Sequence, residues 1–208
     1  MKKITFIIAL IATTLSGYSQ NNNNVDAPAP IEQSKFSLGF KGGYGHSTIM
    51  PFTHATFCPS WDAGIAAVYA PAIHWGVEAD VLYSEEGVNY KYRTSSETTY
   101  HTSQIYLDYL RVPVKAVYFF RDYDKDFRPK IAVGPSVGFL VNQVNSTGAN
   151  SFDVGATGLV GFNYRIARAV WINVDAVYYQ GLLDTYDNRS SNELNSNMRL
   201  DAGINVGF

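Results

Sequence analysis

The last segment of the chain, NMRLDAGINVGF, alternates between polar and apolar side chains from Asn197 to the final Phe208. Successive side chains of a β-strand point to opposite faces, so this segment predicts a strand with one apolar and one polar face. The apolar face must lie against either a protein core or lipid, and the rest of the sequence favours lipid. The residues of the apolar parity are Met198, Leu200, Ala202, Ile204, Val206 and Phe208.

The same alternation recurs in seven earlier segments, each long enough to cross a bilayer as a tilted strand of about 9–11 residues. No stretch after the N-terminus approaches the ~20 apolar residues of a spanning helix. The pattern predicts an all-β fold: an eight-stranded antiparallel up-and-down transmembrane β-barrel with a filled polar interior. The expected strands span about residues 35–45, 60–70, 73–84, 104–120, 128–142, 153–164, 170–182 and 197–208.

Glycines and balanced charges on the polar faces indicate that these faces point inward. An eight-stranded barrel has room inside only for packed side chains, and glycine makes space there for longer charged ones. The reverse arrangement, with an apolar core and a charged exterior, is that of a soluble lipocalin-like ligand-binding barrel and stands as an alternative. The polar-face charges are five acids and five bases: Asp62, Glu78, Asp80, Asp175 and Asp201 with Lys41, Arg111, Lys115, Lys130 and Arg199.

The positions of these charges along neighbouring strands predict which of them meet. Buried charges are costly unless they are paired, so we expect a network that plugs and holds the barrel. A gated polar conduit or a proton site is the alternative. The expected pairs are Glu78 with Lys115, Arg111 with Asp80, Asp175 with Arg199, and Asp201 with Lys41.

Aromatic residues lie near the ends of the expected strands on the apolar faces, where the aromatic girdles of outer-membrane barrels belong. The composition agrees, because 14% of the residues are aromatic and only 16% are charged, below the ~25% of ordinary soluble domains. The expected girdle residues are Tyr44, Trp61, Tyr69, Trp75, Tyr83, Tyr118, Tyr164 and Tyr178.

The connections alternate in length, which predicts the orientation of the barrel. Outer-membrane barrels have long extracellular loops and short periplasmic turns, so both termini are expected in the periplasm. The loop 85–103 is expected to prolong two strands beyond the membrane as a hairpin that can recruit a partner by strand addition; a solvated loop is the alternative. Long loops are expected near 46–59, 85–103, 144–151 and 184–196, and shorter turns near 71–72, 121–127 and 165–169.

The N-terminus has the form of a secretory signal peptide. Lys2 and Lys3 precede a short apolar run, and Gly17 and Ser19 fit a cut before Gln20. The next residues are polar, rich in Asn and without periodicity, which is typical of a disordered segment. The expected parts are a signal peptide (1–19), a disordered periplasmic lead-in (20–34) and an outer-membrane β-barrel domain (35–208).

Charge and cysteine content exclude two further classes of protein. Without Lys2 and Lys3 the chain has 14 basic and 18 acidic residues, which argues against a nucleic-acid partner. The single cysteine, Cys58, cannot form an internal disulfide. No His or acid pattern frames it as a nucleophile, so we expect it in a loop.

Four segments carry a family pattern. YLDYLRVPVKAVYFF (106–120), IAVGPSVGFLV (131–141), VDAVYYQGLLD (174–184) and the terminal GINVGF resemble strands of the PorT-like, or "porin family", outer-membrane β-barrel proteins. The resemblance covers Lys35 to Phe208 and implies a barrel that serves as an accessory of an envelope or secretion complex. Phe208 resembles the C-terminal signal by which the barrel-assembly machinery recognises such proteins.

Two prolines lie inside expected strands. Proline removes a donor from the β-ladder and is unusual in a closed sheet. We therefore expect a bulge or local kink at Pro113, and the same at Pro135.

The candidates for catalysis are few. His46, His54 and His101 fall in expected outer loops, and Asp108 and Asp184 near the same rim, but no spacing fixes a partner for any of them. His46 and His54 also lack the ligand spacing of a metal site. We expect a protein without catalytic residues, cofactor or metal, which contacts outer-membrane lipid and surface or envelope partners and is no general diffusion pore. A small outer-membrane enzyme acting on lipid or peptide at the barrel rim is the alternative.

Overall fold

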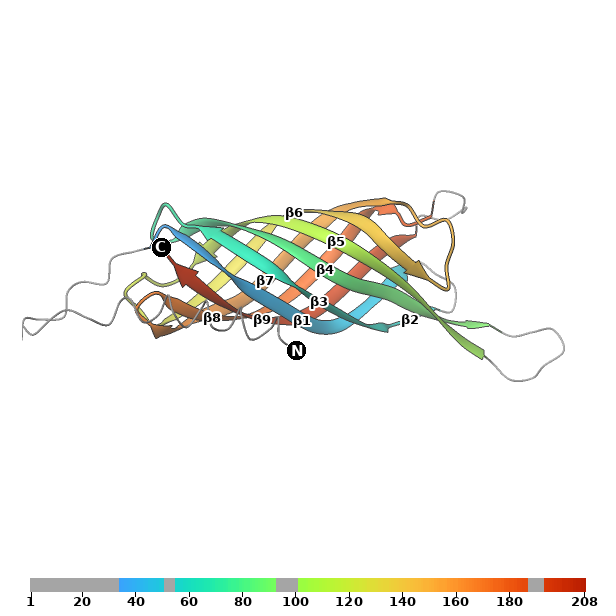
Figure 1. The fold of residues 1–208 in the computed structure, drawn as a ribbon, viewed down its shortest axis with the longest axis horizontal. Helices are drawn as coiled ribbons and strands as arrows, with labels where there is room; N and C mark the ends of the chain where they lie inside the picture. The colour runs from blue at the N-terminus through green and yellow to red at the C-terminus, as the bar shows by residue number, and fades with distance from the viewer. Residues whose placement is uncertain (1–33, 51–54, 93–100, 187–192) are drawn as a thin grey trace, which may run out of the picture. The chain divides into compact units, whose positions relative to one another are not determined.

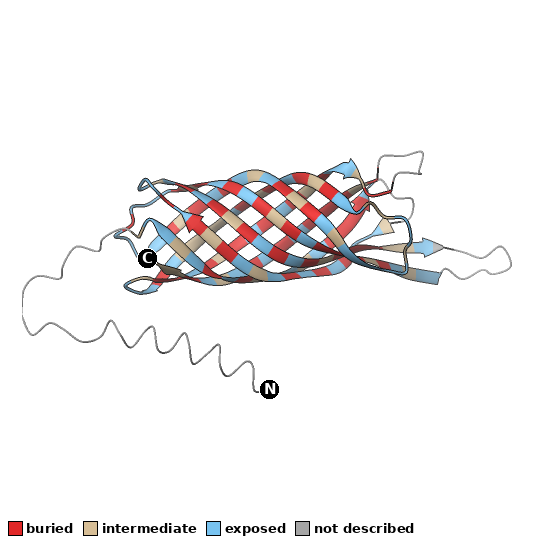
Figure 2. Ribbon diagram, turned by 45° about the horizontal axis from the view of Figure 1, so that its top comes forward, coloured by how far each residue is buried: buried red, intermediate tan, exposed pale blue. Residues whose placement is uncertain are grey.

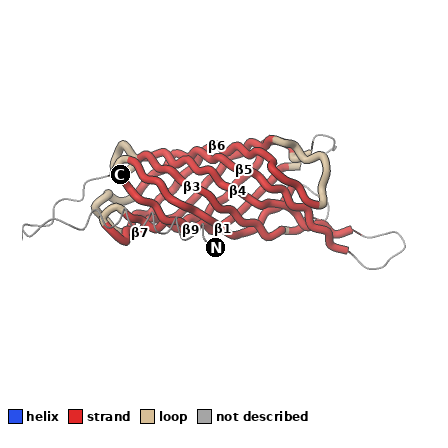
Figure 3. The backbone as a smooth tube through the Cα atoms, in the orientation of Figure 1, coloured by secondary structure: helices blue, strands red, loops and turns tan. Residues whose placement is uncertain are grey.

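The computed structural model describes residues 34–50, 55–92, 101–186 and 193–208, which form β-strands joined by turns (Figure 3). The signal peptide, the lead-in up to residue 33 and His54 lie outside these residues. Within the described part of the chain, no helix is long and apolar enough to cross a membrane. The strands are β1 (Phe36–Met50), β2 (Ala55–Thr56), β3 (Cys58–Tyr69), β4 (Trp75–Tyr92), β5 (His101–Phe119), β6 (Phe127–Val144), β7 (Phe152–Ala167), β8 (Val170–Asp184) and β9 (Leu194–Gly207).

The eight long strands close into one antiparallel barrel (Figure 1). Each pairs with its neighbours in the chain, the two-residue β2 adds to β4 beyond the end of β3, and β1 pairs with β9 over Ser37↔Gly207 to Met50↔Leu194. Ser34 and Phe208 therefore lie at one end, the termini end, and the far ends of β4 and β5, paired at Tyr92↔His101, lie at the other, the hairpin end. The predicted eight-stranded antiparallel barrel is confirmed.

The predicted parity is also confirmed, since buried and exposed residues alternate along the strands (Figure 2). Apolar side chains lie outside and charges inside. Phe40, Val133 and Leu200 are 54%, 64% and 62% exposed, whereas all ten predicted polar-face charges are buried. This is the reverse of a lipocalin-type barrel. A belt of outward apolar residues is the surface that lipid requires.

The expected girdle aromatics form outward-facing pairs at two levels. Near the termini end, Phe36 is opposite Tyr69 and Trp75 is opposite Tyr118. Towards the hairpin end, Trp61 contacts Tyr83 with 5.5 Å between ring centroids. Two aromatic levels separated by aliphatic side chains match the two interfaces of a bilayer.

Several strands are longer than the sequence predicted. β1 runs to Met50, and β4 and β5 remain paired as far as Tyr92↔His101, which confirms the expected hairpin within the described residues. The alternation continues in these extensions with polar residues on both faces, so polarity alone made them look like loops. Cys58, expected in a loop, is instead the buried first residue of β3, opposite Ser47.

Of the bulge or local kink expected at Pro113, the bulge is wrong. The ladder between β5 and β6 omits the two pairs after Pro113↔Ser136 but keeps the same register when it resumes at Ala116↔Val133. Pro135 lies outward and stays opposite Ala156. The register shift in this pair of strands falls at Asp108 and Tyr109 instead.

Two apolar clusters add to the charged interior and were not predicted as such. One contains the buried residues Val68, Ala70, Val117, Phe119, Ala132, Leu159 and Val177. The other, at the hairpin end, contains Ile49, Val88, Ile105, Leu107, Tyr109 and Tyr186.

Interior glycines make room for charged side chains, as expected, and the effect is local. A Cβ on Gly161 would lie 2.2 Å from Asp175 Oδ1 and 2.3 Å from the backbone oxygen of Val174. Gly158, on the same strand but with the outward parity, would meet nothing closer than the Ala132 oxygen at 3.9 Å. The first glycine is therefore required by packing and the second is not.

We predict that Gly161→Ala destabilises the barrel by about 1–3 kcal/mol, because the added methyl group overpacks the interior. Gly158→Ala, the matched control, should be neutral or stabilising by about 0.4–1 kcal/mol, because alanine restricts the unfolded chain. Urea unfolding midpoints in lipid vesicles measure both. Equal midpoints for the two variants would contradict the packing role.

Candidate functional site

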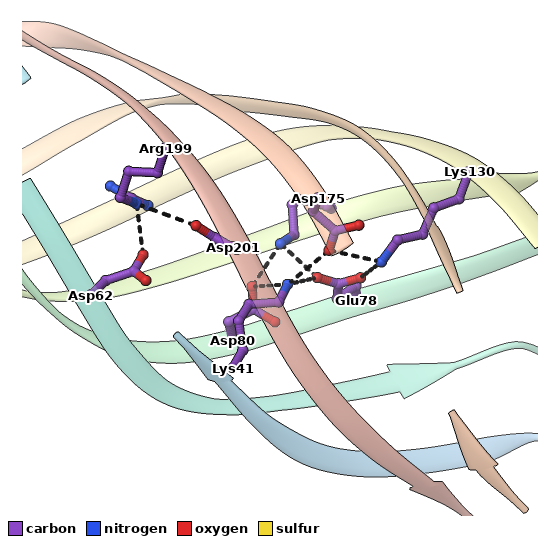
Figure 4. A network of polar contacts seen from close by, with 9 residues as sticks. Lys41, Asp62, Glu78, Asp80, Lys130, Asp175, Arg199 and Asp201 are labelled. Atoms are coloured by element: carbon purple, nitrogen blue, oxygen red, sulfur yellow. Dashed lines mark hydrogen bonds and ion pairs between the residues drawn. The ribbon is translucent and has the colours of Figure 1, made fainter. Parts of the chain in front are cut away.

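Every long strand contributes at least one charged side chain to the barrel interior, and these side chains form three separate clusters. Figure 4 shows two of the clusters, which we call the central cluster and the Arg199 cluster. The third, the Arg111 cluster, lies nearer the hairpin end. The clusters differ in their balance of charge.

The central cluster is neutral, with three lysines against three carboxylates. Lys41 Nζ lies 2.5 Å from Glu78 Oε1, 3.4 Å from Asp80 Oδ2 and 3.6 Å from Asp175 Oδ2. Lys115 Nζ bridges Glu78 Oε1 at 2.8 Å and Asp80 Oδ2 at 2.6 Å. The predicted pairing of Glu78 with Lys115 is confirmed, and the two residues are direct register partners.

Lys130 completes the central cluster. Its Nζ lies 3.0 Å from Asp175 Oδ2 and 3.4 Å from Glu78 Oε2. The six side chains come from β1, β4, β5, β6 and β8, so this one cluster crosslinks five strands through the lumen.

The Arg199 cluster places one base against two acids. Arg199 Nε lies 2.8 Å from Asp62 Oδ2 and 3.7 Å from Asp201 Oδ1. Gly43 lies opposite both Asp62 and Asp201 in the ladders. Its missing side chain leaves the space that the two carboxylates fill, since a Cβ there would be 2.0 Å from Asp201 Oδ1.

The Arg111 cluster repeats this imbalance. Arg111 Nε and Nη2 donate to the two oxygens of Glu86 at 2.5 and 2.6 Å, and Nη2 also donates to Asp153 Oδ2 at 2.9 Å. The guanidinium stacks on the ring of Tyr179 at 3.9 Å, and the Tyr179 hydroxyl donates to Asp153. Asn195 Nδ2 donates to Glu86 at 2.5 Å. Glu86 is fully buried, although the sequence placed it in a loop.

Three of the predicted ion pairs are wrong. They were inferred from positions counted along neighbouring strands, whereas the actual pairs depend on the strand register and on contacts across the lumen. Arg111 binds Glu86 and Asp153 rather than Asp80, and Asp175 binds lysines rather than Arg199. Asp175 is the register partner of Asp201, so two acids lie opposite each other. Each of them is paired with a base at a different position of the ladder. Lys41 is opposite Gly203, and it forms ion pairs with acids of β4 and β8 rather than with Asp201.

A fourth group of charges closes the termini end and was missed by the sequence analysis. Arg128 and Arg165, 3% and 7% exposed, stack on aromatic rings without a carboxylate within ion-pair distance in the described part of the chain. Their partners are Phe119, Tyr123 and Trp171, at centroid distances from 4.2 to 5.8 Å. Tyr123 belongs to the turn between β5 and β6 and folds into the barrel mouth, which accounts for the unusual length of that turn.

The acids of this turn face solvent and have other partners. Lys125 Nζ lies 2.7 Å from Asp124 Oδ2, and this hydrogen bond holds the pKa of Asp124 below its usual range. Asp122 Oδ1 lies 3.4 Å from His74 Nε2. The two arginines are therefore the buried charges of the mouth.

The catalytic candidates are not brought together. His46 is exposed on β1 beside Tyr44, and His101 is exposed at the start of β5. Asp108 is buried and accepts from Asn142 Nδ2 at 2.9 Å, while the main-chain oxygen of Asp184 accepts from Asn150. Within the described residues, no three His, Cys, Asp or Glu side chains are grouped as a metal site.

Comparison with known proteins agrees with this architecture. A model of the outer membrane protein beta-barrel domain matches residues 13–208. The chain belongs to this family. This outer-membrane barrel shows no significant similarity to any curated protein. The family places the protein in the outer membrane.

Two solved structures share its fold. The barrel is similar to the outer membrane protein OprG from Pseudomonas aeruginosa, with 14% identity and a TM-score of 0.56 over 86% of this chain and 98% of that one. It is also similar to the N-terminal β-barrel domain of Pseudomonas aeruginosa OprF, with 13% identity and a TM-score of 0.52 over 85% and 100%. At such identities the likeness concerns the fold alone.

We predict that Arg111→Met destabilises the protein by about 3–5 kcal/mol, because Glu86 and Asp153 would remain buried without their base. Asp153→Asn is the control, since it preserves the pair of Arg111 with Glu86 and an amide oxygen that can accept from Tyr179; its cost should be about 1 kcal/mol. Unfolding midpoints in detergent or lipid measure the difference. A smaller loss in Arg111→Met than in Asp153→Asn would contradict this account.

Proposed function

We propose that this outer-membrane barrel is closed to general diffusion and has a structural or interaction role rather than an enzymatic one. The observation that carries the proposal is that all eight long strands send charged side chains into one interior, where these side chains pair across the lumen. Such a network holds the strands together and fills the space that a pore requires. The resemblance to PorT-like proteins supports an accessory role in an envelope or secretion complex.

The proposed orientation has both termini in the periplasm and the hairpin end outside. It is supported by the short connections at the termini end and the long β4–β5 extension at the other (Figure 1). Phe208 is proposed as the residue by which the barrel-assembly machinery recognises the last strand. Its backbone N–H donates to the Phe36 oxygen at 2.8 Å and its ring lies 6.4 Å from that of Phe36, at the seam that closes the barrel.

We expect no steady conductance when the purified protein is inserted into planar lipid bilayers. The physical reason is that ions would have to separate the paired charges of the central cluster to pass. The conductance of the unmodified protein is compared with that of Lys115→Ala, in which the central cluster is weakened because the base that bridges Glu78 and Asp80 is removed. A stable open state of the unmodified protein would overturn the plugged-barrel proposal.

We propose that the β4–β5 hairpin carries the interaction role. Thr102, Ser103 and Gln104 pair with β4 on one side, whereas pairing with β6 begins only at Tyr106↔Val144. The Gln104 oxygen accepts from the Asn145 side chain at 3.0 Å, but the rest of this short edge has no β6 strand beside it. A strand edge that stands outside the barrel can take an extended segment of a partner by strand addition.

We predict that Thr102→Lys with Gln104→Lys abolishes capture of a surface or envelope partner by the tagged protein, because lysine on an edge strand opposes strand addition. Gln143→Lys with Thr147→Lys adds the same charge at the same end of the barrel and should leave capture unchanged. Crosslinking in intact cells followed by pull-down measures both. Equal capture by the two double variants would argue against the hairpin as the docking site.

A further inference from the structure

The mouth at the termini end holds two buried positive charges whose hydrogen-bonding capacity is only partly used. Arg128 donates through Nε to the Arg121 oxygen at 3.1 Å and through Nη2 to the Ile73 oxygen at 2.8 Å. Arg165 donates through Nη2 to the Tyr123 oxygen, whereas its Nε and Nη1 are buried and have no partner in the described structure. A guanidinium has five N–H donors, so several remain available at this mouth.

Aromatic stacking accounts for only part of the stability of these charges. Arg128 lies over Phe119 at 4.2 Å and Arg165 over Trp171 at 4.4 Å, and Tyr123 flanks both. Cation–π contacts are weak, whereas burying a charge without a counter-charge is costly. The other buried bases of the barrel each have a carboxylate, so this mouth is the place where the described interior has unmatched positive charge.

A cavity lies beside Arg128, and Arg165 stacks on two residues of its lining, Tyr123 and Trp171. It has a volume of about 30 Å³, and its lining includes Arg128, Tyr123 and Trp171 together with the polar side chains of Ser37, Asn163 and Asn205. This is room for about two water molecules or for one small oxyanion group. Side chains of Ser and Asn can donate to such a group, and arginine binds phosphate and carboxylate oxygens in a bidentate manner.

We propose that this mouth is an anion site that receives a phosphoryl group. The double positive charge of Arg128 and Arg165 matches a phosphate dianion rather than a single carboxylate, and the cavity is sized for the group rather than for a larger molecule. Under the proposed orientation the site opens at the periplasmic face, where free phosphate and phospholipid headgroups both present this chemistry. The inference is independent of the interaction role proposed for the hairpin.

The test uses the full chain folded in detergent micelles and titrated with inorganic phosphate, with sodium chloride added to keep ionic strength constant. Isothermal calorimetry should show saturable binding, and Arg128→Gln should weaken it roughly 10–100-fold, because the charged side chain that lines the cavity is lost. Arg168→Gln, an exposed arginine in the next turn, is the matched control and should bind as the unmodified protein does. Arg128→Lys keeps the positive charge but lacks the planar guanidinium, so its affinity for phosphate should lie between those of Arg128→Gln and the unmodified protein.

A second arm separates the two sources of phosphate. The protein in nanodiscs of phosphatidylcholine is compared with nanodiscs that also contain phosphatidic acid, and the free-phosphate titration is repeated in each. Loss of phosphate binding only with phosphatidic acid identifies a lipid headgroup as an occupant, and unchanged binding identifies the free ion; both support the site. Absence of saturable binding in micelles, or equal binding by Arg128→Gln and Arg168→Gln when both run as folded barrels on unheated gels, overturns the proposal.

Discussion

The narrowness of a closed eight-stranded barrel is the constraint on which the rest of this structure depends. Its lumen has room only for side chains, so the charges of the three clusters find their counter-charges among the residues of facing strands. This requirement explains why the bases and acids of the central cluster are equal in number and why several carboxylates share each lysine. It also explains Gly43 and Gly161, which leave the space that Asp201 and Asp175 occupy.

The fold was predictable because a lipid-facing strand must alternate between outward apolar and inward polar side chains, whichever residues of each kind it uses. Alternation identified eight strands, their inner faces and all ten of the charges first assigned to the interior. The pairing within that interior was not predictable to the same degree. Glu78 and Lys115 are direct partners on adjacent strands, so counting sufficed. Arg199 reaches Asp62 across β1, past Gly43, and no periodicity indicates a contact between strands that are not neighbours.

The residues that sequence reasoning missed lie where strands end. Glu86 looked like a loop residue because β4 continues beyond the apolar belt, where polar residues lie on both faces of the strand. Asp153 was placed at the start of an expected strand, but it was not recognised as one of the interior charges. Arg128 and Arg165 lie at the opposite end and were assigned to turns or their borders. Their signal was available in principle: each carries the inward parity of its strand, and the long, aromatic-containing turn 121–127 had no other explanation.

The distribution of charge along the barrel distinguishes the charged residues that stabilise the fold from those that are free to serve a function. The central cluster is neutral and its members hold one another, so changes there act on stability first. The Arg111 and Arg199 clusters each carry one excess acid, while the mouth at the termini end carries two excess bases. A fold shared at 13–14% identity rests on parity rather than on particular residues. The features that distinguish this protein from other barrels of the same fold therefore lie at its two ends, in the protruding hairpin and in the arginine-containing mouth. Side chains there neither face lipid nor have to fit the middle of the lumen.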